Sequence, residues 1–275
     1  MFLDILWEMW YNVLTIEGVS MAKTFKDKLT FNYNGVDSIE FGIYSVSLDS
    51  GMFDEHLVAD RSINESEVGK GRRVLNRIDE EPIEFELTLA FMDGFDESLL
   101  DDVIDWLFQD YYKPFYFEGS EDRIYHCVAE GSSTLVHTGF REGYFTINMR
   151  CNSSRAYSRT KTTDRVTATG FTPAELTIEN AGDEMVTAQY SIRANSDTII
   201  LIEMDKNVQI RNIKSGEDIF IDSHREIIET NKPNVYHYDD VDGDLRYLNL
   251  KRGVNNIKVT GDCSFQIRYK EEYRK

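Results

Sequence analysis

The chain has 275 residues, of which 41% are hydrophobic and 12% aromatic, a composition typical of folded proteins rather than disordered ones. Its formal net charge of −19 argues against direct nucleic-acid binding, because an acidic surface repels the phosphate backbone. The three scattered cysteines (Cys127, Cys151 and Cys263) form no disulfide framework and predict small buried side chains in a reducing compartment.

The first 20 residues are rich in large apolar side chains but carry Asp4 and Glu8. They have neither the basic start and cleavage site of a signal peptide nor the length of a bilayer-spanning segment, so we expect no membrane insertion. Two interpretations remain, an amphipathic helix or an extension upstream of a natural start at Met21, and we favour the second. We assign residues 1–24 to this leader.

From Lys28 to Arg150 the chain is predicted to form short strands separated by turns. Apolar and polar residues alternate around Phe31 and Tyr33, again over residues 39–43, and most clearly over residues 83–91. This period of two is typical of half-buried antiparallel strands. Further strands are expected at residues 115–117, 124–129, 135–137 and 144–150.

One segment of this half has helical spacing instead. Apolar residues recur at the helical period between Leu99 and Leu107, after Asp96 or Ser98 as the N-cap, and Lys113-Pro114 is expected to end the helix. We expect the apolar stripe of this helix to pack across a sheet.

Residues 152–164 are polar and basic without apolar periodicity, and they are the predicted boundary between two domains. After them, short strands resume without a helix, including one at residues 245–250, which indicates a sandwich or jelly roll. The predicted fold is mainly β: an N-terminal β-sandwich or split-barrel-like domain (residues 25–151) with one packed α-helix, a linker (152–164) and a C-terminal β-sandwich domain (165–275).

No catalytic or metal-binding pattern is recognisable. The five histidines are scattered without metal-ligand spacing, and no serine lies in a GxSxG elbow. The acidic run Asp239–Asp244 superficially resembles a calcium loop, but the EF-hand register places Tyr238 first and Asn249 twelfth, so we expect a solvated turn. We therefore expect no catalytic residue, metal or cofactor and no enzymatic activity. Paired carboxylates leave a hydrolase as a third choice.

A basic segment stands out on this acidic chain. Gly69-Lys70-Gly71-Arg72-Arg73 lacks the upstream glycine and following Ser/Thr of a phosphate loop, so we predict a mobile basic hairpin at the edge of a sheet. Its cations are candidate subunit-interface residues because they are suited to acidic faces of a neighbouring subunit. These candidates are Lys70, Arg72, Arg73 and Arg77.

In order along the chain, several short motifs resemble the distal tail protein (Dit) family of long-tailed bacteriophages and prophages. In the N-terminal half they are Phe41-Gly42-Ile43 leading to Val46, Asp60-Arg61-Ser62, the hairpin Gly69–Arg73, the strand Ile83–Phe91, Ile104-Asp105-Trp106-Leu107 followed by Lys113-Pro114-Phe115, Tyr125–Val128 and Phe145–Cys151. In the C-terminal half they are Ile178–Gly182 and Leu248–Ile257, which are similar to the family's galectin-like sandwich. The leader is not part of the family pattern.

The resemblance implies a structural protein of the virion tail tip, assembled in the host cytoplasm. It implies a hexameric ring of this chain, contacting the tail tube protein above and the tail-tip or tail-associated lysin protein below, with a receptor-binding protein as a further partner. An acidic lumen would let DNA pass without adhering. The alternative is a carbohydrate-binding module or receptor-binding accessory protein, for which the candidate ligand-binding aromatics are Tyr236, Tyr238 and Tyr247.

Overall fold

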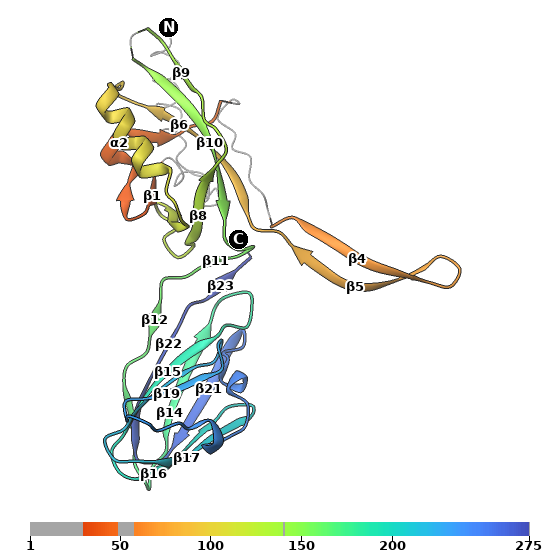
Figure 1. Ribbon diagram of the computed structural model, residues 1–275, viewed down its shortest axis with the longest axis vertical. Helices are drawn as coiled ribbons and strands as arrows, with labels where there is room; N and C mark the ends of the chain where they lie inside the picture. Colours follow the sequence, from red (N-terminus) through yellow and green to blue (C-terminus); the bar gives the residue numbers. More distant parts are fainter. Residues whose placement is uncertain (1–29, 49–57, 140, 275) are drawn as a thin grey trace, which may run out of the picture.

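The computed structural model describes residues 30–48, 58–139 and 141–274, so the leader lies outside the described residues. It shows two β-rich bodies joined end to end, with a hairpin projecting sideways near their junction (Figure 1). Each body has its own hydrophobic core, one built from residues between Phe31 and Cys151 and the other from residues between Ala168 and Tyr269. The predicted mainly β fold is confirmed.

The N-terminal body is an eight-stranded antiparallel sheet with the strand order β2-β1-β7-β8-β10-β6-β3 and with β9 paired to β10. The strands are β1 (Phe31–Tyr33), β2 (Val36–Asp37), β3 (Ile43–Ser45), β6 (Glu84–Phe91), β7 (Lys113–Phe117), β8 (Tyr125–Glu130), β9 (Leu135–His137) and β10 (Gly143–Cys151). Along β6, Leu87, Leu89 and Phe91 are buried while Glu84 and Glu86 are exposed. The alternation predicted for residues 83–91 is therefore confirmed.

The helix α2 (Glu97–Leu107) covers one face of this sheet (Figure 1). Asp96, one of the two predicted caps, is its N-cap, with the carboxylate accepting a 2.8 Å hydrogen bond from the Leu99 amide. The buried Trp106 indole donates a 2.8 Å hydrogen bond to the Tyr33 carbonyl. The helix ends at Leu107 rather than at Lys113-Pro114, because Phe108 leaves helical geometry and the later dipeptide already belongs to β7.

Two strand predictions are wrong. The start of the segment 39–43 is a 3-10 helix (Ser38–Phe41), because Gly42 has a φ of +62° and turns the chain before β3 begins. The segment 245–250 begins with a 3-10 helix (Leu245–Leu248), whose two buried leucines lie three residues apart on one face. In both segments, closely spaced apolar residues were interpreted as the alternation of a strand.

The C-terminal body is a sandwich of two antiparallel sheets. The six-stranded sheet has the order β12-β22-β15-β18-β19 with β13 paired to β22, and the five-stranded sheet has the order β14-β21-β16-β17-β20. The strands are β12 (Lys161–Thr162), β13 (Val166–Ala168), β14 (Ala174–Asn180), β15 (Ala188–Ala194), β16 (Thr198–Glu203), β17 (Asn207–Ile213), β18 (Asp218–Asp222), β19 (Ile227–Thr230), β20 (Val241–Asp242), β21 (Gly253–Thr260) and β22 (Cys263–Tyr269). Tyr190 and Phe265 from one sheet and Ile200 and Ile202 from the other are fully buried in the core. All three cysteines of the chain are free and buried, as predicted.

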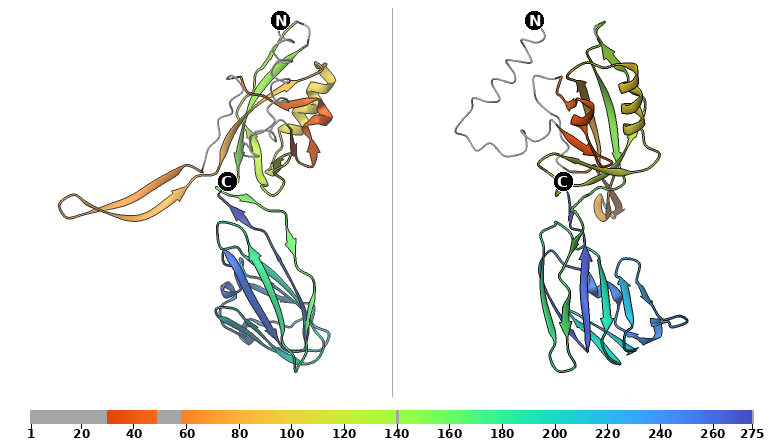
Figure 2. Two further views of the ribbon diagram at one scale, coloured as in Figure 1. Left: turned by 180° about the vertical axis from the view of Figure 1, so that it is seen from behind. Right: turned by 90° about the vertical axis from the view of Figure 1, so that its left-hand side faces the viewer.

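Residues 152–164 connect the two bodies and contain short strands. Strand β11 (Ala156–Tyr157) pairs with β23 (Glu272–Tyr273), so the end of the chain returns to the connection. Tyr157 also forms a two-way backbone bridge with Ile124 of the N-terminal body. The connection is thus held from both sides, and Figure 2 shows the two bodies aligned along one axis.

Candidate assembly surfaces

A two-stranded hairpin leaves the N-terminal body near the junction and projects into solvent (Figures 1 and 2). In the described part of the chain, β4 (Arg61–Val68) and β5 (Arg72–Glu80) pair only with each other. A hairpin was predicted here, but it forms its own sheet rather than the edge of a larger one. At about 3.3 Å per residue its arms reach roughly 25 Å. An isolated two-stranded hairpin is marginally stable in water, so packing against a partner would stabilise this one.

Apolar side chains on the hairpin are exposed on both of its faces. Ile63 lies opposite Ile78, with Leu75 near them on the same face, and Val68 and Val74 lie on the other face. All five side chains are between 40% and 64% exposed. Scattered exposed apolar residues are ordinary, but a narrow element that exposes five of them resembles an unoccupied interface. Sequence reasoning missed these residues. Their apolar side chains occur at alternate positions that belong to both faces of the hairpin, so they give no single apolar face.

The four predicted interface cations all lie on the hairpin or in its turn, and they divide into two kinds. Arg73 lies 3.2 Å from Glu65, and Arg77 lies 2.9 Å from Asp79, in exposed ion pairs within the hairpin. Lys70 in the turn and Arg72 beside it form no ion pair with any residue that the structure describes. These two cations are available to an external carboxylate.

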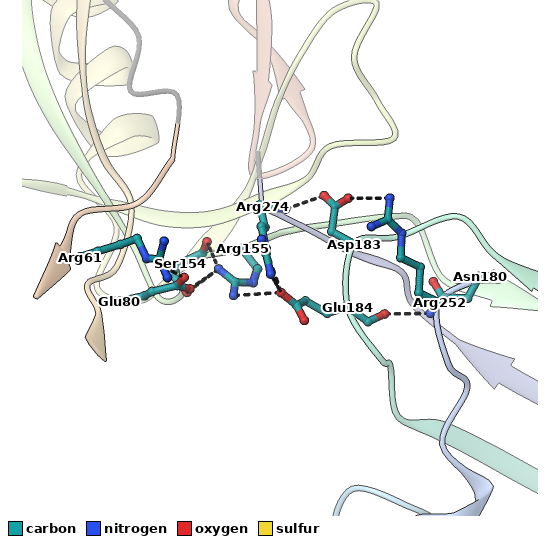
Figure 3. A network of polar contacts seen from close by, with 9 residues as sticks. All are labelled: Arg61, Glu80, Ser154, Arg155, Asn180, Asp183, Glu184, Arg252 and Arg274. Atoms are coloured by element: carbon teal, nitrogen blue, oxygen red, sulfur yellow. Dashed lines mark hydrogen bonds and ion pairs between the residues drawn. The ribbon is translucent and has the colours of Figure 1, made fainter. Parts of the chain in front are cut away.

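The base of the hairpin is tied to the C-terminal body by a polar network (Figure 3). Arg155 of the connection lies between two carboxylates, with Nη1 2.5 Å from Glu80 at the end of β5 and Nη2 3.4 Å from Glu184. Arg274 donates hydrogen bonds of 2.8 and 2.9 Å to the same Glu184 carboxylate. Arg61, where β4 begins, lies 3.5 Å from Glu80. The network therefore links hairpin, connection and sandwich.

The electrostatics of this network favour its charged state. The hydrogen bond from Arg155 lowers the pKa of the Glu80 carboxyl, and the positive charges of Arg61 and Arg274 act in the same direction. The Arg155 side chain is only 17% exposed, so its two ion pairs are better shielded from water than ordinary surface pairs. Sequence reasoning singled out Arg61 only as part of a family motif and did not predict the network, because partners so far apart along the chain leave no local pattern.

A second buried carboxylate fixes the returning end of the chain. Glu271 is 1% exposed and accepts hydrogen bonds from Lys161 (2.7 Å), the Ala181 amide (3.0 Å) and the Tyr273 hydroxyl (2.5 Å). Burial opposes ionisation of Glu271, but these donors outweigh it, so its pKa is lowered. The Arg123 guanidinium of the N-terminal body lies 3.3 Å from the Tyr273 ring centroid, which adds a further contact between the bodies.

The predicted ligand-binding tyrosines lie in the excursion between β19 and β21. Tyr236 is 78% exposed. Tyr238 lines a depression of about 320 Å³ with Glu226 and Asp244, whereas the Tyr247 ring lies 4.2 Å from the Lys206 ammonium. The excursion is anchored by His237, whose Nε2 lies 2.9 Å from the buried Glu217 carboxylate. Sugar binding by these tyrosines stays a prediction.

Neither a metal-binding cluster nor a membrane-spanning helix is found in the described residues. No cluster of three or more His, Cys, Asp or Glu residues suited to a metal ion occurs among them. Within the same ranges, no helix has the length and apolar character needed to cross a membrane.

Comparison with known proteins covers both bodies of the chain. Residues 26–153 match the family described as a phage tail protein N-terminal domain, and residues 139–269 match the family described as a phage tail C-terminal domain. The chain is 27% identical over 248 residues to the SPbeta prophage-derived uncharacterized protein YomH of Bacillus subtilis (strain 168), spanning 88% of this chain and 97% of the relative.

Among solved structures, the chain is similar to the Dit (gp 19.1) protein of phage SPP1, described as a paradigm of the hub adsorption apparatus in phages that infect Gram-positive bacteria. The TM-score is 0.60 at 17% identity, over 88% of this chain and 98% of that one. The likeness to Dit confirms the predicted fold. The two domain families together cover residues 26–269 and confirm the predicted phage tail protein, so the chain belongs to the phage tail proteins.

Proposed function

We propose that this phage tail protein forms a hexameric hub ring at the distal end of the tail and acts by assembly rather than by catalysis. In this proposal the N-terminal bodies form the ring, between the tail tube protein and the tail-tip or tail-associated lysin protein. The C-terminal sandwiches project outward, where a receptor-binding protein can attach. Assembly takes place in the host cytoplasm.

The observation that carries the proposal is the projecting hairpin. Beyond its base, it exposes five apolar side chains and two cations that form no ion pair with a described residue, and its strands pair with no other described strand. Burial of apolar area is the main favourable contribution to association, so these residues are suited to a protein interface. A second copy is the partner we propose, because a hairpin that reaches sideways from each copy suits a ring.

The face of the eight-stranded sheet turned away from α2 suits a lumen through which DNA passes. It displays Glu84, Glu86 and Glu130, while Arg150 on the same face pairs with Glu84 and lies 3.8 Å from Glu130. The excess of carboxylates repels phosphate, so DNA would slide past this surface rather than adhere to it. A ring structure with lysines along its lumen would contradict this part of the proposal.

The junction supports the outward placement of the sandwich. Arg155, Glu184 and Arg274 hold the connection against the sandwich, and Glu80 holds it against the base of the hairpin. A connection fixed in this way sets the direction in which each sandwich points from the ring. A flexible tether would leave that direction undefined.

Ring formation is tested by light scattering after size exclusion, followed by negative-stain microscopy. We expect the wild-type chain to give a closed ring with the mass of six copies. A variant in which residues 64–77 are replaced by a two-residue Asn-Gly turn removes most of the hairpin but leaves both hydrophobic cores intact. We expect this variant to be monomeric and to unfold at the same urea concentration as the wild type.

Two outcomes are decisive: the first contradicts the ring itself, and the second contradicts only the hairpin as its subunit contact. One is a wild-type chain that stays monomeric both alone and when mixed with its tail tube protein. The other is a shortened-hairpin variant that still closes into the same ring. The second outcome would assign the subunit contact to another surface.

A further inference from the structure

The outward face of α2 is an acidic stripe with two exposed apolar side chains. Glu97, Asp101, Ile104 and Asp105 share one side of the helix, because each lies three or four residues from another of them, and Phe108 follows directly after the last turn. All five are exposed, and Ile104 is 51% and Phe108 39% exposed. The opposite side is buried against the sheet through Val103, Trp106 and Leu107. We call the five exposed residues the α2 stripe.

The charges of the α2 stripe are not compensated by any residue that the structure describes. From Asp96 to Tyr112 the sequence contains no lysine, arginine or histidine. Asp101 lies four residues from both Glu97 and Asp105, a spacing at which like charges repel on a helix. Asp105 also lies in the last turn, where the helix dipole disfavours an anion. No described residue forms an ion pair with Asp101 or Asp105. A cationic partner would relieve this repulsion.

The tip of the hairpin has the complementary character. Val68 lies opposite Arg72, and Val74 lies on the same face one step further along β5, so two valines flank an unpaired guanidinium. Lys70 adds a second unpaired cation in the adjoining turn. This face, which we call the hairpin tip, therefore offers two cations and two apolar side chains. The α2 stripe offers carboxylates and two apolar side chains.

The hairpin and α2 lie on opposite sides of the N-terminal body (Figures 1 and 2). The tip therefore points away from the α2 stripe of its own chain and reaches only that of another copy. Two different patches on opposite sides of one molecule give head-to-tail contacts, which close into a ring when the rotation between copies permits. Patches of this kind do not make a twofold dimer.

We propose that the hairpin tip of each copy docks on the α2 stripe of the next copy. This inference rests on the proposed ring function and names the surface that receives the hairpin. Arg72 and Lys70 meet the carboxylates of Asp101 and Asp105, and Val68 and Val74 cover Ile104 and Phe108. The contact combines apolar burial with opposite charges, so it strengthens in dilute salt and weakens as salt screens the charges.

Reciprocal charge reversal tests this docking on the full chain. The variants Lys70→Glu with Arg72→Glu, and Asp101→Lys with Asp105→Lys, are each expected to raise the concentration needed for ring assembly at least about tenfold. Combining all four substitutions restores opposite charges and is expected to recover most of the assembly. Reversal at Asp101 places a lysine four residues after Glu97, which favours the helix, so misfolding of this variant is not expected. Glu175→Lys with Glu179→Lys, on exposed positions of the C-terminal sandwich, is the matched control.

Disulfide trapping gives a second readout. Lys70→Cys and Asp101→Cys in one chain should yield a covalent ladder up to the full ring under mild oxidation, with little background because the three native cysteines are buried. Suppose that the wild type assembles. The docking is then wrong if the Asp101→Lys and Asp105→Lys variant assembles normally, if the combined variant does not recover, or if no ladder forms. The proposed ring function stands in each of these cases. If the wild type never assembles, the proposed function fails with it.

Discussion

The C-terminal sandwich and the projecting hairpin use the same residue types in opposite ways. In the sandwich, Ile202 and Phe265 are completely buried between two sheets. In the hairpin, Ile63 and Leu75 are more than half exposed, and the element is supported by a single pair of strands. The sandwich buries its apolar side chains within the chain, whereas the hairpin leaves its apolar side chains available to a partner. Substitutions in the sandwich core should therefore lower the free energy of unfolding, whereas substitutions in the hairpin should weaken assembly.

The largest loss of stability is expected in the sandwich core. Phe265→Ala leaves a cavity between the sheets and should lower the free energy of unfolding of this domain by about 3–5 kcal/mol. The matched control is Phe171→Ala, because Phe171 is fully exposed, and we expect a change within about 0.5 kcal/mol. Urea denaturation followed by circular dichroism measures both. Equal shifts for the two variants would contradict the assigned core.

The next effect is expected at the buried carboxylate of Glu271. Glu271→Gln removes the charge that pairs with Lys161 and should lower the free energy of unfolding by about 2–3 kcal/mol at pH 7. The folded-state pKa of Glu271 is lowered. Its contribution is therefore fully present above the unfolded pKa of about 4.3 and is lost as pH falls through the folded pKa.

Urea denaturation of the wild type and this variant from pH 7 to pH 3 checks the sign. We expect the difference between them to be constant near neutrality and to shrink below about pH 4.3. The exposed Glu175→Gln is the control and should show no such convergence. A difference that widens in acid would show that the ionised carboxylate is not the stabilising form.

A smaller effect is expected at the junction that joins the two regions. Arg155→Ala leaves Glu80 and Glu184 without their shared partner and should lower the free energy of unfolding by about 1–2 kcal/mol. It should also speed proteolytic cleavage within residues 152–164. Arg159→Ala removes an exposed arginine 3.6 Å from Glu121 and should change stability by less than about 0.5 kcal/mol. Equal cleavage rates in the two variants would contradict the bridging role of Arg155.

Local signals made part of the fold predictable from the sequence. Asp96 and Ser98 before an apolar stripe were enough to locate the start of α2 to within two residues, and the alternation in residues 83–91 was enough for β6. The strand prediction was wrong where apolar residues are closely spaced without a clear period, as between Leu245 and Leu250. There, contacts in the folded chain decided between strand and 3-10 helix.

The candidate surfaces were less predictable, for a related reason. Lys70 and Arg72 stood out because basic residues cluster beside two glycines on an acidic chain, so the hairpin was found from a local pattern. The network around Arg155 was missed because Glu80 lies 75 residues before it and only the fold brings the two together. The acids of the α2 stripe were visible in the sequence, but the sequence analysis considered only the buried side of this helix and did not identify its exposed side as a surface.

The smallest effect on stability is expected in the hairpin itself. Val68→Ser with Val74→Ser replaces two side chains that are 55% and 44% exposed, so the free energy of unfolding should change by less than about 0.5 kcal/mol. The same variant should nevertheless assemble less well, because the buried area that these residues contribute appears only when a partner covers them. Denaturation and light scattering on one preparation separate the two quantities. A large loss of stability with unchanged assembly would mean that the hairpin packs within its own chain, and the contrast with the sandwich would disappear.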